Sequence, residues 1–156
     1  MSDIDRLGGV CVDKYRNIPT KLNIDHHATN TNFGDINLVD GGRASACEMV
    51  YELLLEMGVD ISVEIGEAVY TGLTTDTGCF QHSSVQPVTH TIAADLMQRG
   101  VNVARLNEKL FKSRTLGQLG LFKCALNNMK YYYKNKVCIT YLTKTNFVDN
   151  SWFLVN

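Results

Sequence analysis

The stretch that decides the fold is Lys21–Asp40, which reads KLNIDHHATNTNFGDINLVD. An apolar step at TKLNID predicts a short strand over Thr20–Asp25, entered from a turn at RNIP. The following segment, Ala28–Arg43, is rich in Asn, Asp, Gly and Thr and is predicted to be a loop, with one short strand at INLV. Asp25–His27 therefore lies at the carboxyl end of a strand, where open α/β sheets gather ligands and catalytic groups.

Two adjacent histidines need an explanation in a chain that has four in all. Successive side chains at a strand end point in different directions, so one histidine can bind a metal ion while its neighbour faces substrate. Asp25 could either ligate the ion or accept a ring N–H. The alternative is that His26 and His27 are exposed loop residues. The strand-end position and the flanking aspartate favour a site without excluding that alternative.

A second polar cluster follows an apolar helical pattern and reads GLTTDTGCF, from Gly72 to Phe80. It sets Asp76 among three threonines and before a glycine. A helix cap with turn-forming threonines is enough to explain Asp76 taken alone. A role for Asp76 in a site therefore depends on what else lies near it.

The remaining pattern is mostly helical. Ser45 and Glu48 match a capping box, in which the serine oxygen accepts an early backbone N–H and the glutamate reaches back. That helix is predicted to end at Gly58. Apolar spacing predicts four more helices, which run from Ile65 into TTDTG, from Pro87 to Gly100, across NVARLNEKLF, and from Leu116 to Met129.

The chain ends in a predicted β-hairpin, formed by KYYYKN and KVCITYLT around a turn at Asn135–Lys136. Strand, helices and hairpin together indicate the α/β class. They contain too few strands for a complete parallel sheet. We therefore expect a partial doubly wound parallel sheet whose N-terminal strands would lie upstream of Met1.

The composition limits the classes of function that the chain can have. The 156 residues are 45% hydrophobic and 20% charged with a net charge of −1, which is typical of a globular protein and gives no positive field for long duplex nucleic acid. No apolar run reaches the roughly 18–20 residues that span a bilayer. Five scattered cysteines without a CxxC pair favour reduced thiols. We expect a cytoplasmic protein that does not bind membranes.

The motifs in order, NIDHHATNTNFGD, ASACEMVYELL, GLTTDTGCFQHSS and THTIAADLMQRG, resemble the DHH phosphoesterase family. The likeness covers nearly the whole chain. It is strongest to the bacterial branch that degrades very short RNAs and dephosphorylates 3′-phosphoadenosine 5′-phosphate. The resemblance implies a hydrolase with two divalent cations, usually manganese. It matches His26 and Asp76 to metal ligands, His27 to the residue facing the scissile phosphate, and Asp25 to the aspartate that orients the pair.

The sequence also departs from the family pattern. The first metal motif, a histidine and two aspartates, is absent, and the bridging aspartate of the second would fall at or ahead of Met1. We therefore interpret residues 1–129 as the C-terminal part of a DHH catalytic domain. Residues 130–156 would be a hairpin and the start of a linker to a substrate domain. We expect at most one Mn²⁺ ion here and little activity from this chain alone.

Other assignments are weaker. His82 and Arg114 are candidates for substrate binding, and exposed surface residues are the simpler explanation of both. Sheet edges and an apolar tail would favour a homodimer. The competing functions are a non-catalytic nucleotide-binding or interaction module, and another DHH activity such as hydrolysis of cyclic-dinucleotide products. Short RNA or a nucleotide is the expected substrate.

Overall fold

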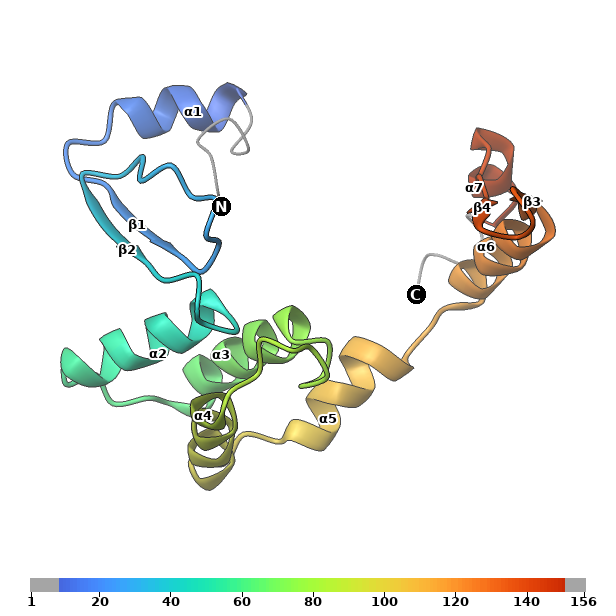
Figure 1. Cartoon of the computed structure of the whole chain (residues 1–156). Coiled ribbons are helices and arrows are strands. Elements are labelled where there is room, and N and C mark those ends of the chain that lie inside the picture. Colours follow the sequence, from blue (N-terminus) through green and yellow to red (C-terminus); the bar gives the residue numbers. More distant parts are fainter. Residues whose placement is uncertain (1–8, 151–156) are drawn as a thin grey trace. The chain divides into compact units, whose positions relative to one another are not determined.

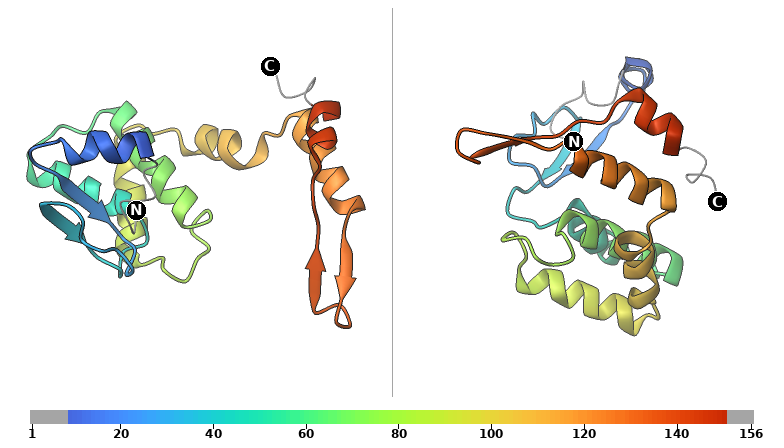
Figure 2. Two further views of the ribbon diagram at one scale, coloured as in Figure 1. Left: turned by 90° about the horizontal axis from the view of Figure 1, so that it is seen from above. Right: turned by 90° about the vertical axis from the view of Figure 1, so that its right-hand side faces the viewer.

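The computed structural model describes residues 9–150. They fall into two compact units that meet in sequence at Leu106 and Asn107. We call residues 9–106 the first unit and residues 107–150 the second unit, and each is described by itself. Figure 1 labels their helices and strands, and Figure 2 gives two further views.

The first unit opens with helix α1, Gly9–Arg16, and then a parallel pair of strands. Strand β1 is Leu22–Asp25 and strand β2 is Ile36–Val39, paired in register from Leu22 opposite Ile36 to Asp25 opposite Val39. Both strands confirm the sequence prediction. Helix α1 was not predicted, because it begins at the second of two consecutive glycines, and glycine disfavours a helix.

Three longer helices follow in the first unit, and their starts follow from local capping. Helix α2, Ala46–Glu56, begins after Ser45, whose hydroxyl accepts the backbone N–H of Cys47. Helix α3, Val63–Asp76, begins after Ser62, and helix α4, Pro87–Gln98, has its proline in the first turn. All three predicted helices are confirmed. The capping box of α2 differs in one detail, because Glu48 accepts the N–H of Ala44 instead of that of Ser45.

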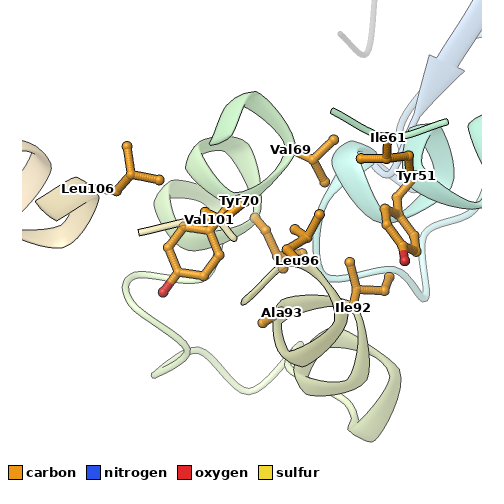
Figure 3. Close-up of a cluster of buried hydrophobic side chains, with 10 residues drawn as sticks. Tyr51, Ile61, Val69, Tyr70, Ile92, Ala93, Leu96, Val101 and Leu106 are labelled. Atoms are coloured by element: carbon orange, nitrogen blue, oxygen red, sulfur yellow. The ribbon is translucent and has the colours of Figure 1, made fainter. Parts of the chain in front are cut away.

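The core lies between these helices, and Figure 3 shows it in close-up. Leu73 of α3 and Leu96 of α4 are completely buried. Burying a side chain of this size contributes about 1.5–3 kcal/mol. The cluster consists of Tyr51, Ile61, Val69, Tyr70, Leu73, Ile92, Ala93, Leu96, Val101 and Leu106.

Helices α2 and α3 approach closely where Gly72 faces Cys47. A Cβ atom built on Gly72 would lie 2.1 Å from the Cys47 sulfur, so any larger residue would require the Cys47 side chain or the helices to shift. Ser45, which caps the start of α2, and Asp76, which ends α3, lie at the same end of this helix pair. The close approach therefore fixes how these two polar residues meet.

The second unit is built from short elements. It follows helix α5, Val103–Asn107, most of which belongs to the first unit and which runs into the π-helix η2, Glu108–Lys112, where the sequence predicted one helix. Helix α6, Leu116–Asn127, starts at a capping box of Thr115 and Gln118. The predicted hairpin is confirmed as the antiparallel strands β3, Lys130–Tyr132, and β4, Val137–Ile139.

The last element, helix α7, Lys144–Asn150, was not predicted. Its start is a reciprocal pair in which Asn146 N–H donates to the Thr143 hydroxyl and Thr143 N–H donates to the Asn146 side chain. Asn146 occupies the position at which a capping box usually has Glu or Gln, so the sequence pattern did not indicate a helix start. Across the described residues, no helix is long and apolar enough to cross a membrane.

The α/β class, with a small parallel sheet and a C-terminal antiparallel hairpin, is confirmed. The further expectation, that this sheet is part of a larger doubly wound sheet, stays a prediction. So does the assignment of residues 1–129 and 130–156 to different domains.

Candidate metal centre

The structure brings His26 and Asp76 together from distant parts of the sequence. His26 follows β1, and Asp76 is the last residue of α3. The Nε2 atom of His26 lies 3.6 Å from Oδ2 of Asp76. Two atoms bound to one ion at about 2.1 Å and a tetrahedral angle lie about 3.4 Å apart. The pair therefore fits two ligands of a single divalent cation.

His26 also presents the correct ring nitrogen. Its Nδ1 lies 3.2 Å from the backbone oxygen of Arg43, which can only accept a hydrogen bond. A hydrogen bond at this contact needs the proton on Nδ1, and in that neutral tautomer Nε2 carries the lone pair on the side of Asp76. A backbone carbonyl that binds the far nitrogen in this way is a usual support of a histidine ligand.

The turn that contains the Arg43 carbonyl is itself held in place. The Arg43 guanidinium makes two hydrogen bonds of 2.7 Å to the carboxylate of Glu52 and a third of 3.3 Å to Asp40. The Gln86 side chain donates to the Gly42 oxygen at 2.8 Å. The turn that orients His26 is thus tied to β2, α2 and α4.

Asp25 and His27 form a second pair beside the first. Nδ1 of His27 lies 2.7 Å from Oδ1 of Asp25, which also accepts the backbone N–H of His27 at 3.2 Å. The Asp25 side chain is 1% exposed and that of His27 is 50% exposed. Nδ1 of His27 therefore faces a buried carboxylate, and the half-exposed ring can present Nε2 to a bound molecule.

The environment of Asp25 keeps it ionised. Burial raises the pKa of this carboxyl, but hydrogen bonds from Asn30 and His27 outweigh it and hold the pKa well below its ordinary value. The side chain of Asn30 donates to Oδ2 of Asp25 at 2.6 Å. A stable negative charge at this position favours the Nδ1-protonated form of His27.

Asp25 is better suited to orienting His27 than to ligating a metal. One donor atom from each of Asp25, His26 and His27 lies within 4.8 Å of the others, so the three form a geometric cluster. Both oxygens of Asp25 are nevertheless occupied by hydrogen bonds from His27 and Asn30. His26 is the member of this cluster that also meets Asp76.

The turn after Asp76 is unusual. Gly78, Cys79 and Phe80 all have positive φ, at 55°, 61° and 63°. The buried Thr77 stabilises it, because its hydroxyl donates to the Leu73 oxygen at 2.7 Å and accepts the N–H of Phe80 at 3.0 Å. Consecutive left-handed residues are rare outside glycine and concentrate at functional sites.

The predicted substrate residues lie in different units. His82 lies beside Asp76, with its Nδ1 2.9 Å from the Asp76 backbone oxygen, and its ring covers Gly78 so closely that a Cβ there would lie 2.5 Å from Nε2. Arg114 is exposed between η2 and α6 of the second unit. Substrate binding by His82 and Arg114 stays a prediction.

Sequence reasoning missed two supporting residues. Asn30 lies in the loop after the two histidines without any local signal of a role, yet its side chain hydrogen-bonds Asp25 and Asn23. Ser45 was explained as a helix cap, yet its hydroxyl also donates to Oδ2 of Asp76 at 2.8 Å. No local spacing could have indicated this second bond, because it joins residues that are 31 positions apart.

Comparison with known proteins supports the class suggested by these motifs. A scan against protein-family models matches none of them. Individual proteins do match: the resemblance to the DHH phosphoesterases is confirmed, and the chain is similar to part of proteins named oligoribonuclease and PAP phosphatase.

Two curated relatives carry the name bifunctional oligoribonuclease and PAP phosphatase NrnA. The protein of Thermus thermophilus is 40% identical over 89 residues, which are 57% of this chain and 28% of that protein. The protein of Bacillus subtilis is 31% identical over 96 residues, which are 60% of this chain and 31% of that protein. The chain thus spans less than a third of either relative.

A solved structure is also similar. It is an exopolyphosphatase-related protein from Bacteroides fragilis, with a TM-score of 0.85 and 28% sequence identity. The match covers 97% of this chain and 45% of that one. The fold described above is therefore one that occurs within a larger protein.

Proposed function

We propose that this chain carries part of the catalytic site of a metal-dependent phosphoesterase. Its substrates would be short oligoribonucleotides, 3′-phosphoadenosine 5′-phosphate, or both. The observation that carries the proposal is the approach of His26 Nε2 to Asp76 Oδ2 at 3.6 Å. The names of the two curated relatives support the substrate class.

In this proposal His26 and Asp76 hold a divalent cation, and Mn²⁺ is the ion we favour. One imidazole and one carboxylate suit Mn²⁺, Fe²⁺ or Zn²⁺, and additional carboxylates would favour the harder ions. When bound, divalent cations activate water and neutralise charge on the phosphoryl oxygens. The structure supports the proposal through the orientation of His26, whose Nδ1 is held by the Arg43 carbonyl.

In this proposal His27 acts on the substrate and Asp25 orients His27. Hydrolysis adds water to phosphorus, breaks the phosphorus–oxygen ester bond and leaves a proton for the departing oxygen. The half-exposed His27 ring is positioned by Asp25 to contact a phosphoryl oxygen through Nε2. A buried carboxylate on the opposite nitrogen stabilises positive charge on the ring, which strengthens that contact as negative charge develops on the phosphate.

The chain alone should be poorly active. Within residues 9–150, the ligand pair that we identify serves one ion, and a two-cation mechanism needs further ligands. Five free cysteines agree with a reducing compartment, and we propose the cytoplasm. A homodimer remains an expectation from the sequence.

Calorimetric titration of the chain with Mn²⁺ tests the ligand assignment. His26→Ala and Asp76→Ala should each weaken binding by at least about tenfold, because each removes one of two ligands. Asp60→Ala removes an exposed carboxylate away from the site and should leave the affinity unchanged. Equal affinity in all four proteins would contradict the assignment.

Activity is the second readout. With Mn²⁺ present, the wild-type chain should hydrolyse a diribonucleotide and 3′-phosphoadenosine 5′-phosphate at rates close to those of the Asp76→Ala variant. Clear turnover that disappears in Asp76→Ala would show that the residues of this chain suffice for the chemistry. It would contradict our proposal that further ligands are needed.

A further inference from the structure

We propose that Ser45 is a positioning residue for the Asp76 carboxylate, in addition to its role as the cap of α2. The inference rests on the proposed function, because it takes Asp76 as a metal ligand. The Ser45 hydroxyl donates to Asp76 Oδ2 at 2.8 Å and accepts the backbone N–H of Cys47 at 3.1 Å. Ser45 is completely buried.

A serine hydroxyl has one proton and two lone pairs. At Ser45 one lone pair is taken by the first turn of α2, which fixes the rotation of the side chain. The proton is directed to Asp76, whose side chain is 41% exposed and lies at the end of α3. Without this bond, a carboxylate at an exposed helix end would sample several rotamers. With it, Oδ2 stays near His26.

The position of Ser45 is fixed by its surroundings. Glu48, one turn further along α2, is buried and accepts hydrogen bonds from the Ala44 N–H at 3.2 Å and the Thr89 hydroxyl at 2.5 Å. This anchors the start of α2 to α4. The contact of Gly72 with Cys47 sets the distance between α2 and α3. The packing of α2, α3 and α4 therefore fixes the position of Ser45, and the serine hydroxyl in turn fixes the Asp76 carboxylate.

A capping role alone would predict a different result from a positioning role. Ser62 provides the matched control, because it caps α3 by accepting the N–H of Ile65 at 3.3 Å and is exposed. Glycine is tolerated at a cap position with a loss of only a few tenths of a kcal/mol. Ser45→Gly and Ser62→Gly should thus disturb their helices to a similar extent, and only Ser45→Gly should affect Asp76.

The experiment measures Mn²⁺ affinity by calorimetry and thermal stability in the full chain. Ser45→Gly should weaken Mn²⁺ binding about tenfold, which is the usual effect of removing a support of a metal ligand. Ser62→Gly should bind Mn²⁺ with the same affinity as the wild-type chain. Ser45→Thr retains the hydroxyl and should stay within about threefold. Asp76→Ala and the double variant Ser45→Gly/Asp76→Ala should bind equally weakly, because the serine acts through the carboxylate.

The outcomes separate the two hypotheses. Unchanged affinity in Ser45→Gly, with binding lost in Asp76→Ala, overturns the positioning role and leaves the proposed function standing. A loss in Ser62→Gly as large as that in Ser45→Gly also overturns it, as does a full loss in a folded Ser45→Thr. Unchanged affinity in Asp76→Ala, or no Mn²⁺ binding by the unchanged chain, overturns both.

Discussion

The two units of this chain use the same kinds of cap and turn but differ in what they bury. The first unit has ten buried hydrophobic residues in one cluster and buried polar residues such as Asp25 and Glu48 with hydrogen-bond partners. Among residues 107–149 of the second unit, only Gly117 is buried. Large apolar side chains such as Phe122 and Tyr133 are exposed there.

The difference shows where a precise site can form. Ser62 and Thr115 cap their helices in the same way in the two units. Caps and turns fix single elements, but only packing fixes one element against another. The residues that we assign to the metal centre all lie in the unit that has the core.

The largest expected effect is in that core. Leu96→Ala should lower the free energy of unfolding of the first unit by about 2–5 kcal/mol, because it opens a cavity at a completely buried position. Leu119→Ala, in α6 and 47% exposed, should cost less than about 1 kcal/mol. Urea unfolding of both variants makes the comparison. Equal losses would mean that the two units do not differ in packing as described.

The close approach of α2 and α3 gives the next prediction. Gly72→Ala should destabilise by about 1–3 kcal/mol, although alanine normally favours a helix, because its Cβ would overlap the Cys47 sulfur. In a Cys47→Ala background the sulfur is gone and most of this cost should disappear. Thermal unfolding of the two single variants and the double variant tests the coupling. Additive effects would contradict it.

The hydrogen bond of the Tyr51 hydroxyl to Asp95 should have a smaller, pH-dependent effect on the free energy of unfolding. The hydrogen bonds from Tyr51 and Arg99 lower the pKa of Asp95. Asp95 therefore stabilises the fold above its unfolded pKa of about 3.9, and this contribution is lost as the pH falls through the lower folded value. Tyr51→Phe should cost about 1 kcal/mol at neutral pH, allowing for the partial exposure of Asp95.

The free energy of unfolding of Tyr51→Phe should also depend less steeply on pH in the acid range. Unfolding by urea between about pH 5 and pH 2.5 should show a smaller decrease in stability for Tyr51→Phe than for the unchanged chain, because less of the Asp95 pKa shift remains. Tyr70→Phe, a second buried tyrosine of the same core, is the control and should keep the original slope. A slope unchanged by Tyr51→Phe would show that its hydroxyl does not set the Asp95 pKa.

The smallest effect concerns the hairpin of the second unit. Tyr133 has a φ of 50° and is 80% exposed, so it carries backbone strain without burial. Tyr133→Gly should stabilise the hairpin by about 0.5–1 kcal/mol. Tyr131→Gly, inside β3, should destabilise it instead. Amide hydrogen exchange of β3 and β4 measures both, and slower exchange only in Tyr133→Gly is expected.

Much of the local structure could be predicted from the sequence. The strand ending at Asp25, the cap at Ser45, the turn at Gly58 and the helix after Pro87 are all present. Their signals lie within a few residues of each element, in side-chain spacing, caps and glycines. Helices α1 and α7 were missed because glycines and an atypical cap concealed the same kind of signal.

The sequence by itself determined which donor groups are available and that each lies at the end of a regular element. Only the tertiary structure decided which of them meet: His26 with Asp76, Asn30 with Asp25, and Ser45 with Asp76. The physical reason is the range of the interactions. Caps and periodicity act along a single element, whereas these contacts depend on how a loop returns and how tightly two helices pack, which many weak contacts decide together.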